Sequence, residues 1–233
     1  MLLEKYFLEY HRTLNQKLFD GETLNEEVRQ AFLRIAHEWM NYANIPESAV
    51  TDIIFTGGNC NFNYSRFSDC DVHIVYDTGS LSRTASIDFW SDYLSEKKSL
   101  WAKNHHITVK GYSVELYAQS SDDKLVASGV YSIERNGWIR KPVHGTYNFK
   151  HDPALIKKVE DTKKTLDSMM ADGVPSAQFK VMKDKLKDMR SASLASGDEF
   201  SFDNLVFKAL RNTGVLDKMN EYLAKRRDKE LSL

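Results

Sequence analysis

The chain has 233 residues, of which 42% are hydrophobic and 28% are charged, and these proportions are ordinary for a globular protein. Its formal net charge of −1 argues against a protein that binds nucleic acid by bulk electrostatic attraction, although local basic patches can still form. The two cysteines, Cys60 and Cys70, lack a second Cys/His pair at zinc spacing, so we expect neither a disulfide framework nor a structural zinc site.

The amino-terminal segment does not have the composition of a secretion signal. Charge appears as early as Glu4 and Lys5, and no small-residue cleavage site follows the first apolar residues. No stretch approaches the roughly 18 apolar residues that a membrane span requires. We therefore expect a cytoplasmic protein with no membrane partner.

The first 45 residues predict helices, because apolar side chains recur there at intervals of three and four. The first stripe consists of Leu2, Leu3, Tyr6, Phe7 and Tyr10. The second stripe consists of Phe32, Ile35, Ala36 and Trp39. Gly21 separates the two stripes, residues 23–27 supply a cap and an acidic first turn, and Pro46 ends the second helix.

The middle of the chain predicts a mixture of strands and one helix. Residues 50–56 and 69–76 are apolar and β-branched or alternate with polar residues, which indicates strands. Residues 86–103 predict a helix, with Ile87, Trp90, Leu94 and Trp101 available for the core. Residues 107–118 predict a third strand region. Further strands follow from residue 130, with Asn136-Gly137 as a type I′ turn.

The character of the chain changes near residue 150. Residues 150–233 contain 17 Lys and Arg against 14 Asp and Glu, whereas residues 1–149 contain 15 against 19. Helices are predicted at 153–170, 176–195 and 201–229, separated by Gly- and Pro-containing breaks. We therefore predict an α+β fold with two parts. Residues 1–150 would form a mixed sheet flanked by helices, and residues 151–233 a helical region.

The most informative segment joins a Gly-Gly turn to two acidic residues. Gly57-Gly58 follows the first strand, ten residues run from Asn59 to Ser68, and Asp69 and Asp71 then begin the next strand. Carboxylates two apart on a strand project from the same face, where their repulsion is costly unless a cation lies between them. Mg²⁺ prefers such oxygen ligands and often shares them with substrate phosphates, which a glycine turn can approach closely.

The run TGGNCNFNYSRFSDCDVH resembles the signature of the polymerase-β-like nucleotidyltransferase superfamily. That signature is a strand, Gly followed by Gly or Ser, roughly ten residues, and then an acid–apolar–acid–apolar sequence. Members place a third carboxylate on a later strand, and Glu115 fits that position, although most members have Asp there. The resemblance implies that Asp69, Asp71 and Glu115 are catalytic metal ligands for Mg²⁺, with Mn²⁺ as the alternative ion.

A narrower resemblance covers about residues 10–145. The stretches LNQKLF, DIIFTGGNCNFNYSRFSDCDVHIVYD, GYSVELY and SGVYSIERNGWIRKP look like a group of predicted nucleotidyltransferases common in large bacteriophages. Those relatives often have Ser at position 58 and Ile or Leu at position 70, and neither difference removes a metal ligand. The resemblance implies a reaction class but no substrate, and a phage-encoded chain would act in the host cytoplasm.

Several further residues are candidates for nucleotide binding, each with a structural alternative. The candidates are Gly57, Gly58, Asn59, Arg66, Ser68 and His73. His73 would share a strand face with the two aspartates, but a hydrogen-bonded structural histidine is an equal alternative. Arg66 lies in the loop that faces the expected phosphates, although loop arginines are commonly only solvated. The four tryptophans are expected in the core. A solvated helix face is expected for Lys180, Lys183, Lys185, Lys187 and Arg190, with guidance of a polynucleotide as the alternative.

The resemblance implies that the chain moves a nucleoside monophosphate from an NTP to a hydroxyl acceptor and releases pyrophosphate. The acceptor remains open among a protein side chain, an RNA end and another nucleotide. One alternative is a non-catalytic nucleotide-binding or protein-interaction module that kept the fold, and another is the partner of a toxin–antitoxin pair. Three crowded carboxylates argue against a decayed site, because nothing physical favours keeping such repulsion.

Overall fold

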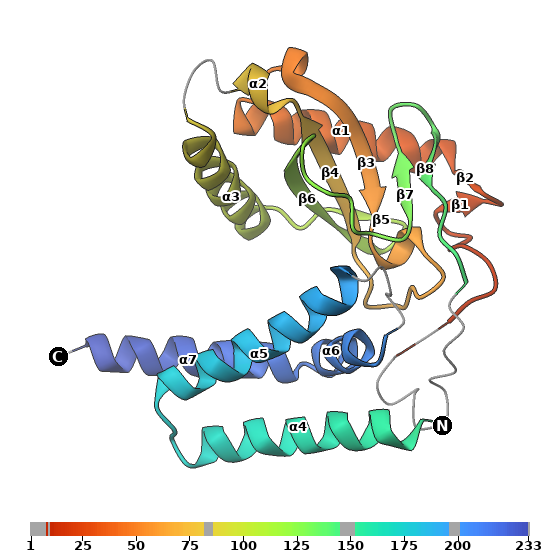
Figure 1. The fold of residues 1–233 in the computed structure, drawn as a ribbon. Coiled ribbons are helices and arrows are strands. Elements are labelled where there is room, and N and C mark those ends of the chain that lie inside the picture. Colours follow the sequence, from red (N-terminus) through yellow and green to blue (C-terminus); the bar gives the residue numbers. More distant parts are fainter. Residues whose placement is uncertain (1–7, 9, 82–85, 145–151, 196–200, 233) are drawn as a thin grey trace. The chain divides into compact units, whose positions relative to one another are not determined.

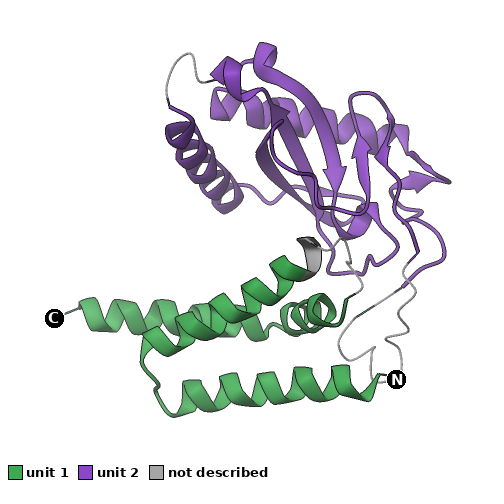
Figure 2. Cartoon of the chain, in the orientation of Figure 1, with its two compact units in different colours: residues 1–9, 145–233 green, residues 10–144 purple. Residues whose placement is uncertain are grey.

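The structure is a computed structural model that describes residues 8, 10–81, 86–144, 152–195 and 201–232. It divides into two compact units, Tyr10–His144 and a second unit formed by Met1–Glu9 together with Gly145–Leu233 (Figure 2). Each unit is described by itself below.

The first unit begins with a small hairpin and a long helix rather than with two helices. Strands β1 (Phe19–Asp20) and β2 (Thr23–Leu24) pair around Gly21, and helix α1 (Glu26–Ala43) follows. The predicted first helix is therefore wrong between residues 10 and 20, and most of the first stripe lies outside the described residues. Asn15 explains part of the difference. Its side chain accepts a hydrogen bond from the Lys17 N–H, and such local bonds compete with helix formation.

A six-stranded mixed sheet forms the centre of this unit (Figure 1), in the order β5-β6-β4-β3-β7-β8. The strands are β3 (Val50–Thr56), β4 (Cys70–Tyr76), β5 (Thr108–Val109), β6 (Tyr112–Ser120), β7 (Val130–Ser132) and β8 (Gly137–Arg140). Strands β4 and β6 run parallel, and the other neighbouring strands run antiparallel. The parallel pair is connected through α2 (Thr78–Leu81) and α3 (Ile87–Asn104), and the short turns η2 (Glu47–Ala49) and η3 (Gly58–Cys60) flank β3.

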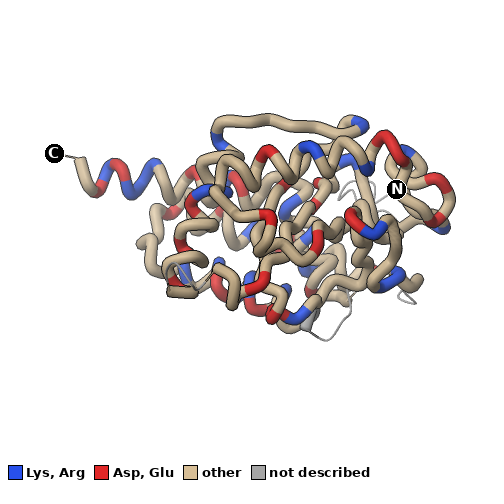
Figure 3. The backbone as a smooth tube through the Cα atoms, turned by 90° about the horizontal axis from the view of Figure 1, so that it is seen from above, with Lys and Arg blue, Asp and Glu red and all other residues tan. Residues whose placement is uncertain are grey.

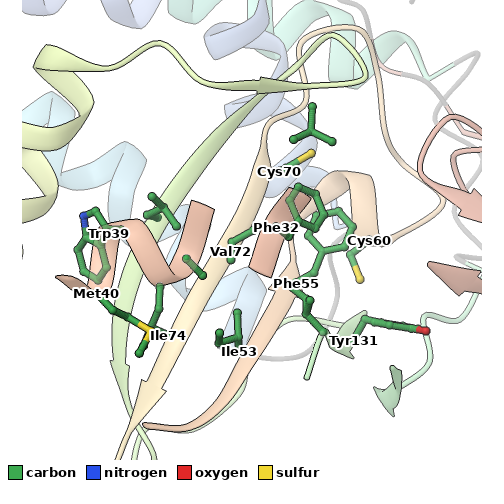
Figure 4. Close-up of a cluster of buried hydrophobic side chains, with 14 of the residues drawn as sticks. Phe32, Trp39, Met40, Ile53, Phe55, Cys60, Cys70, Val72, Ile74 and Tyr131 are labelled. Atoms are coloured by element: carbon green, nitrogen blue, oxygen red, sulfur yellow. The ribbon is translucent and has the colours of Figure 1, made fainter. Parts of the chain in front are cut away.

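One face of the sheet packs against α1 and α3 to form the core of the unit (Figure 4). Phe32 and Trp39 of α1 are fully buried against alternate residues of β3 and β4, including Ile53 and Val72. Alternate strand residues point to opposite faces, so Asp71, His73 and Glu115 project from the other side. The apolar stripe predicted for α1 is confirmed in part, because Phe32, Ala36 and Trp39 are buried but Ile35 is only partly buried. On α3, Ile87 is exposed rather than in the core.

Two predictions for the strand-rich part of the chain differ from the structure. The predicted strand region 107–118 is a hairpin, because Lys110 and Gly111 both adopt positive φ and connect β5 to β6. Asn136-Gly137 does not form a type I′ turn. Ser132 pairs with Gly137, so the loop has four residues, and only Asn136 of the two has positive φ. The tyrosine hydroxyl of Tyr131 donates to Asn136 Oδ1 at 2.8 Å and supports this longer loop.

The second unit contains helices α4 (Pro153–Ala171), α5 (Ser176–Ala195), α6 (Phe202–Asn212) and α7 (Val215–Leu231). The predicted single helix at 201–229 is wrong, because Gly214 adopts a left-handed conformation with φ 72° and separates α6 from α7. Leu155, Leu166, Phe179, Leu205 and Leu210 are buried in this unit. The predicted α+β fold with a helical carboxyl-terminal region is confirmed.

Charged positions of both signs are distributed through the two units. Figure 3 shows basic and acidic positions interspersed along the backbone rather than segregated by sign. None of the helices in the described residues combines the length and the apolar composition needed to cross a membrane.

Candidate metal centre

Three carboxylates converge on the face of the sheet opposite the core. Asp71 on β4 is the register partner of Glu115 on β6, and Asp69 lies immediately before β4. Each of the three offers a carboxylate oxygen such that these atoms all lie within 4.8 Å of one another, and all three residues are partly buried. Like charges at this separation repel strongly in a partly desolvated site, so the arrangement favours a bound cation.

The donor set fits a hard divalent ion. Every candidate ligand is a carboxylate oxygen, which is the ligand type that Mg²⁺ and Mn²⁺ prefer and softer metals do not. Cys60 and Cys70 are both buried in the hydrophobic core. The acidic cluster can therefore bind a divalent metal through Asp69, Asp71 and Glu115.

Gly57 leaves the space that Asp71 occupies. Its φ of 82° and ψ of −166° are adopted almost only by glycine, and a Cβ built there would lie 1.9 Å from Asp71 Oδ2. A Cβ on Gly58 would lie 3.1 Å from the Ser68 hydroxyl oxygen. The turn between β3 and η3 therefore packs directly against the carboxylate cluster. A side chain at position 57 would collide with Asp71.

Asn59 is fully buried and connects the glycine turn to the start of β4. Its Nδ2 donates to the carbonyl oxygens of Ser68 and Asp69, at 3.3 and 3.1 Å, and its Oδ1 accepts from Asn15 Nδ2 at 2.8 Å. These bonds fix the backbone that leads into Asp69 and Asp71. The structure thus places Asn59 beneath the site, in contact with the protein backbone, rather than at its surface.

Tyr117 and Lys98 extend the site beyond the predicted residues. The Tyr117 hydroxyl donates to Glu115 Oε2 at 2.5 Å, and burial, then the charge of Asp71, raise the pKa of this phenol, so it remains a donor. The Lys98 ammonium lies 3.3 Å from the centre of the Tyr117 ring and 3.9 Å from Glu115 Oε2. Burial lowers the pKa of Lys98, whereas Glu115, Asp71 and Asp69 oppose that shift.

His73 follows Asp71 by two residues on β4 and projects from the same face of the sheet, as the strand pattern predicted. Its Nδ1 donates to Gln119 Oε1 at 2.7 Å, since an amide oxygen only accepts, and its ring stacks on Tyr117 at 4.6 Å. Nε2 lies 3.4 Å from the Thr56 hydroxyl. Burial lowers the pKa of His73, which favours the neutral ring. The geometry makes His73 a support for Tyr117.

The remaining predicted residues lie in the loop between the glycine turn and β4. Ser68 is buried, and its hydroxyl accepts from the Ser65 N–H at 2.9 Å. Arg66 is exposed and its guanidinium lies 4.7 Å from the Phe67 ring centre. The structure therefore brings Gly57 and Gly58 to the carboxylates, buries Ser68 within the loop, and leaves Arg66 at the surface.

Comparison with known proteins adds little to this geometry. No family model matches the chain, and a search of curated proteins finds no match. Among solved structures, the chain is similar to a chain of the CdnC:HORMA-deltaN complex from E. coli MS115-1, with a TM-score of 0.24 and 11% sequence identity. The similarity covers 84% of this chain and 61% of that chain. These comparisons leave the resemblance to phage nucleotidyltransferases a prediction.

Proposed function

We propose that the chain is a metal-dependent nucleotidyltransferase that moves a nucleoside monophosphate from an NTP to a hydroxyl acceptor. The observation that supports this most directly is the packing of Gly57 against Asp71. It places a turn without side chains, suited to phosphate, against a cluster of three carboxylates, suited to a divalent ion. Phosphate cradle and metal ligands side by side are the requirements of in-line transfer at phosphorus.

Asp69, Asp71 and Glu115 would hold the ion, Mg²⁺ or Mn²⁺, as the cluster of carboxylate oxygens indicates. When bound, such an ion supplies Lewis-acid stabilisation of the charge that builds up on the phosphate oxygens. The protein holds the carboxylate ligands in place. Asn59 fixes the backbone that carries Asp69, and Tyr117 holds one oxygen of Glu115 through its hydrogen bond.

The bond changes follow from this placement. The acceptor oxygen attacks the α-phosphorus, a new oxygen–phosphorus bond forms, and the bond from the α-phosphorus to the bridging oxygen of the β-phosphate breaks. Pyrophosphate leaves on the side of the turn formed by Gly57 and Gly58. The hydroxyl proton passes to Glu115 and then to solvent, because this carboxylate is partly exposed. The Lys98 ammonium, close to Glu115, offsets negative charge as phosphate enters.

The test is transfer of radioactive label. The wild-type protein and the Asp69→Ala/Asp71→Ala variant are incubated with each α-³²P-labelled NTP and Mg²⁺ or Mn²⁺, with cell protein and RNA extracts as acceptors. Label in protein, RNA or nucleotide fractions that requires both aspartates supports the proposal. Equal labelling by the variant contradicts it. An absence of both labelling and metal-dependent NTP binding would favour a non-catalytic module instead.

A further inference from the structure

A cavity of about 450 Å³ lies between α3 and the edge of the sheet formed by β5 and β6. Its volume is within the range of pockets that hold small organic ligands. The lining side chains that bear on its chemistry are Lys98, Trp101, His105, His106, Ser113 and Glu115. Because Glu115 both lines the cavity and belongs to the carboxylate cluster, the cavity adjoins the candidate metal centre at this residue.

The order of the strands puts this cavity and the glycine turn on opposite sides of the carboxylates. Gly57 follows β3, Asp71 lies on β4, and Glu115 lies on β6, and the three strands are neighbours in the order β6-β4-β3. In-line displacement requires the attacking oxygen and the leaving group to lie on opposite sides of the phosphorus. If pyrophosphate leaves on the β3 side, the attacking hydroxyl comes from the β6 side, where the cavity is.

The lining combines hydrogen-bond donors with aromatic surface. Lys98, His105 and His106 contribute an ammonium and two imidazoles, which suit a phosphate group. Trp101 and His105 pack against each other with ring centroids 4.0 Å apart and form an aromatic wall. Ring systems such as nucleobases pack on surfaces of this kind. A hydroxyl on a short protein side chain would reach Glu115 and leave most of this lining without contacts.

We propose that the cavity binds the acceptor, and that the acceptor is a phosphate-bearing nucleoside unit. Its sugar hydroxyl lies at Glu115, its base packs near Trp101 and His105, and its phosphate interacts with the donors of the lining. The inference rests on the proposed function. A free nucleotide and the terminal nucleotide of an RNA share this chemistry, and the two sources are separated by experiment.

The experiment measures donor and acceptor binding separately, with Ca²⁺ as an ion expected to permit binding without turnover. Calorimetric titrations use AMP, CMP, GMP and UMP as acceptor probes, a short RNA with a free 3′-hydroxyl, and α,β-methylene analogues of the four NTPs as donor probes. Ala102→Trp fills the cavity from α3, and His106→Leu removes one hydrogen-bonding imidazole. Ser95→Trp adds the same bulk to an exposed position of the same helix and serves as the control.

We expect Ala102→Trp to weaken binding of a monophosphate or the RNA at least tenfold and His106→Leu to weaken it severalfold. Binding of the NTP analogue should change less than twofold, and Ser95→Trp should match wild type in both. A parallel loss of analogue binding, or unchanged binding of every acceptor probe, would overturn the inference. Analogue binding without any acceptor binding would overturn it while leaving the proposed function intact. Monophosphate binding in the cavity without analogue binding would contradict the proposed function instead.

Discussion

Asp71 and Glu115 are direct register partners on two adjacent parallel strands, so their carboxylates stand side by side on the same face of the sheet. Asp69 adds a third charge within 4.8 Å. Opposite charges at directly facing positions stabilise a sheet, whereas like charges there destabilise it. The protein therefore carries an electrostatic cost at this place, and a bound cation would remove it. This repulsion determines whether a substitution in the cluster raises or lowers the stability of the metal-free protein.

Replacing one carboxylate should stabilise the metal-free protein. Asp71→Asn relieves repulsion with both neighbours, and we expect a gain on the order of 1 kcal/mol in the free energy of unfolding, since partial exposure screens the charges. Urea denaturation in the presence of a chelator measures it. Asp122→Asn, at an exposed position outside the cluster, is the control and should change stability little. A clear loss of stability in Asp71→Asn would mean that Asp71 serves the fold.

Gly57→Ala should impair the site more than a comparable glycine change elsewhere. Both Gly57 and Gly111 have positive φ, 82° and 87°, so alanine costs about 1–2 kcal/mol of backbone strain at either position. Only at position 57 would the new methyl group collide with Asp71, whereas nothing lies within 4 Å of a Cβ at position 111. Metal binding by calorimetry should therefore fall in Gly57→Ala and persist in Gly111→Ala. Equal metal affinity in both would show that the turn does not shape the cluster.

Asn59→Ala should destabilise the protein by about 3 kcal/mol, because it leaves buried hydrogen-bonding groups of Asn15, Ser68 and Asp69 without their partner. Thermal or urea unfolding gives the value. Asn41→Ala, at an exposed position of α1, should cost less than about 0.5 kcal/mol. If Asn59→Ala keeps wild-type stability and loses only NTP binding, then Asn59 contacts nucleotide, as the sequence first suggested.

Tyr117→Phe should lower metal affinity or transfer about 10- to 100-fold while preserving the fold, because it deletes the donor that orients Glu115. The ring that stacks on His73 is retained in this variant. Tyr112→Phe changes a tyrosine of the same strand whose side chain points to the opposite face, and it should behave as wild type. If Tyr117 orients Glu115, Tyr117→Phe lowers the metal affinity. If Tyr117 has a purely structural role, the variant changes only the stability of the fold.

Part of this organisation could be predicted from the sequence. The spacing of Asp69 and Asp71 on a strand, together with the resemblance, indicated the cluster that the structure brings together with Glu115. Tyr117 carried an unused signal, because it follows Glu115 by two residues on the same strand and must share its face. The break between α6 and α7 also had a signal in the sequence, because Asn212 and Gly214 are residues of types that commonly end helices.

Other features depend on packing that no local pattern encodes. Lys98 reaches Glu115 from α3. Its position at the site could not be predicted, because no sequence pattern specifies where α3 packs along β6. Asn59 was a candidate for nucleotide binding, and its burial depends on hydrogen bonds to the carbonyl oxygens of Ser68 and Asp69, nine and ten residues further along the chain. The cavity beside Glu115 likewise exists only because α3 and the β5–β6 hairpin meet around it.

The central claim is that Asp69, Asp71 and Glu115 hold a divalent ion together with the phosphates of an NTP. The most direct measurement is a Mn²⁺ titration, followed by electron paramagnetic resonance, of the wild type and Asp69→Asn/Asp71→Asn. Each titration is made with and without an α,β-methylene NTP analogue. The account predicts that wild type binds Mn²⁺, that the analogue tightens this binding, and that the variant loses both effects. Identical Mn²⁺ binding by the two proteins, unaffected by the analogue, would contradict it.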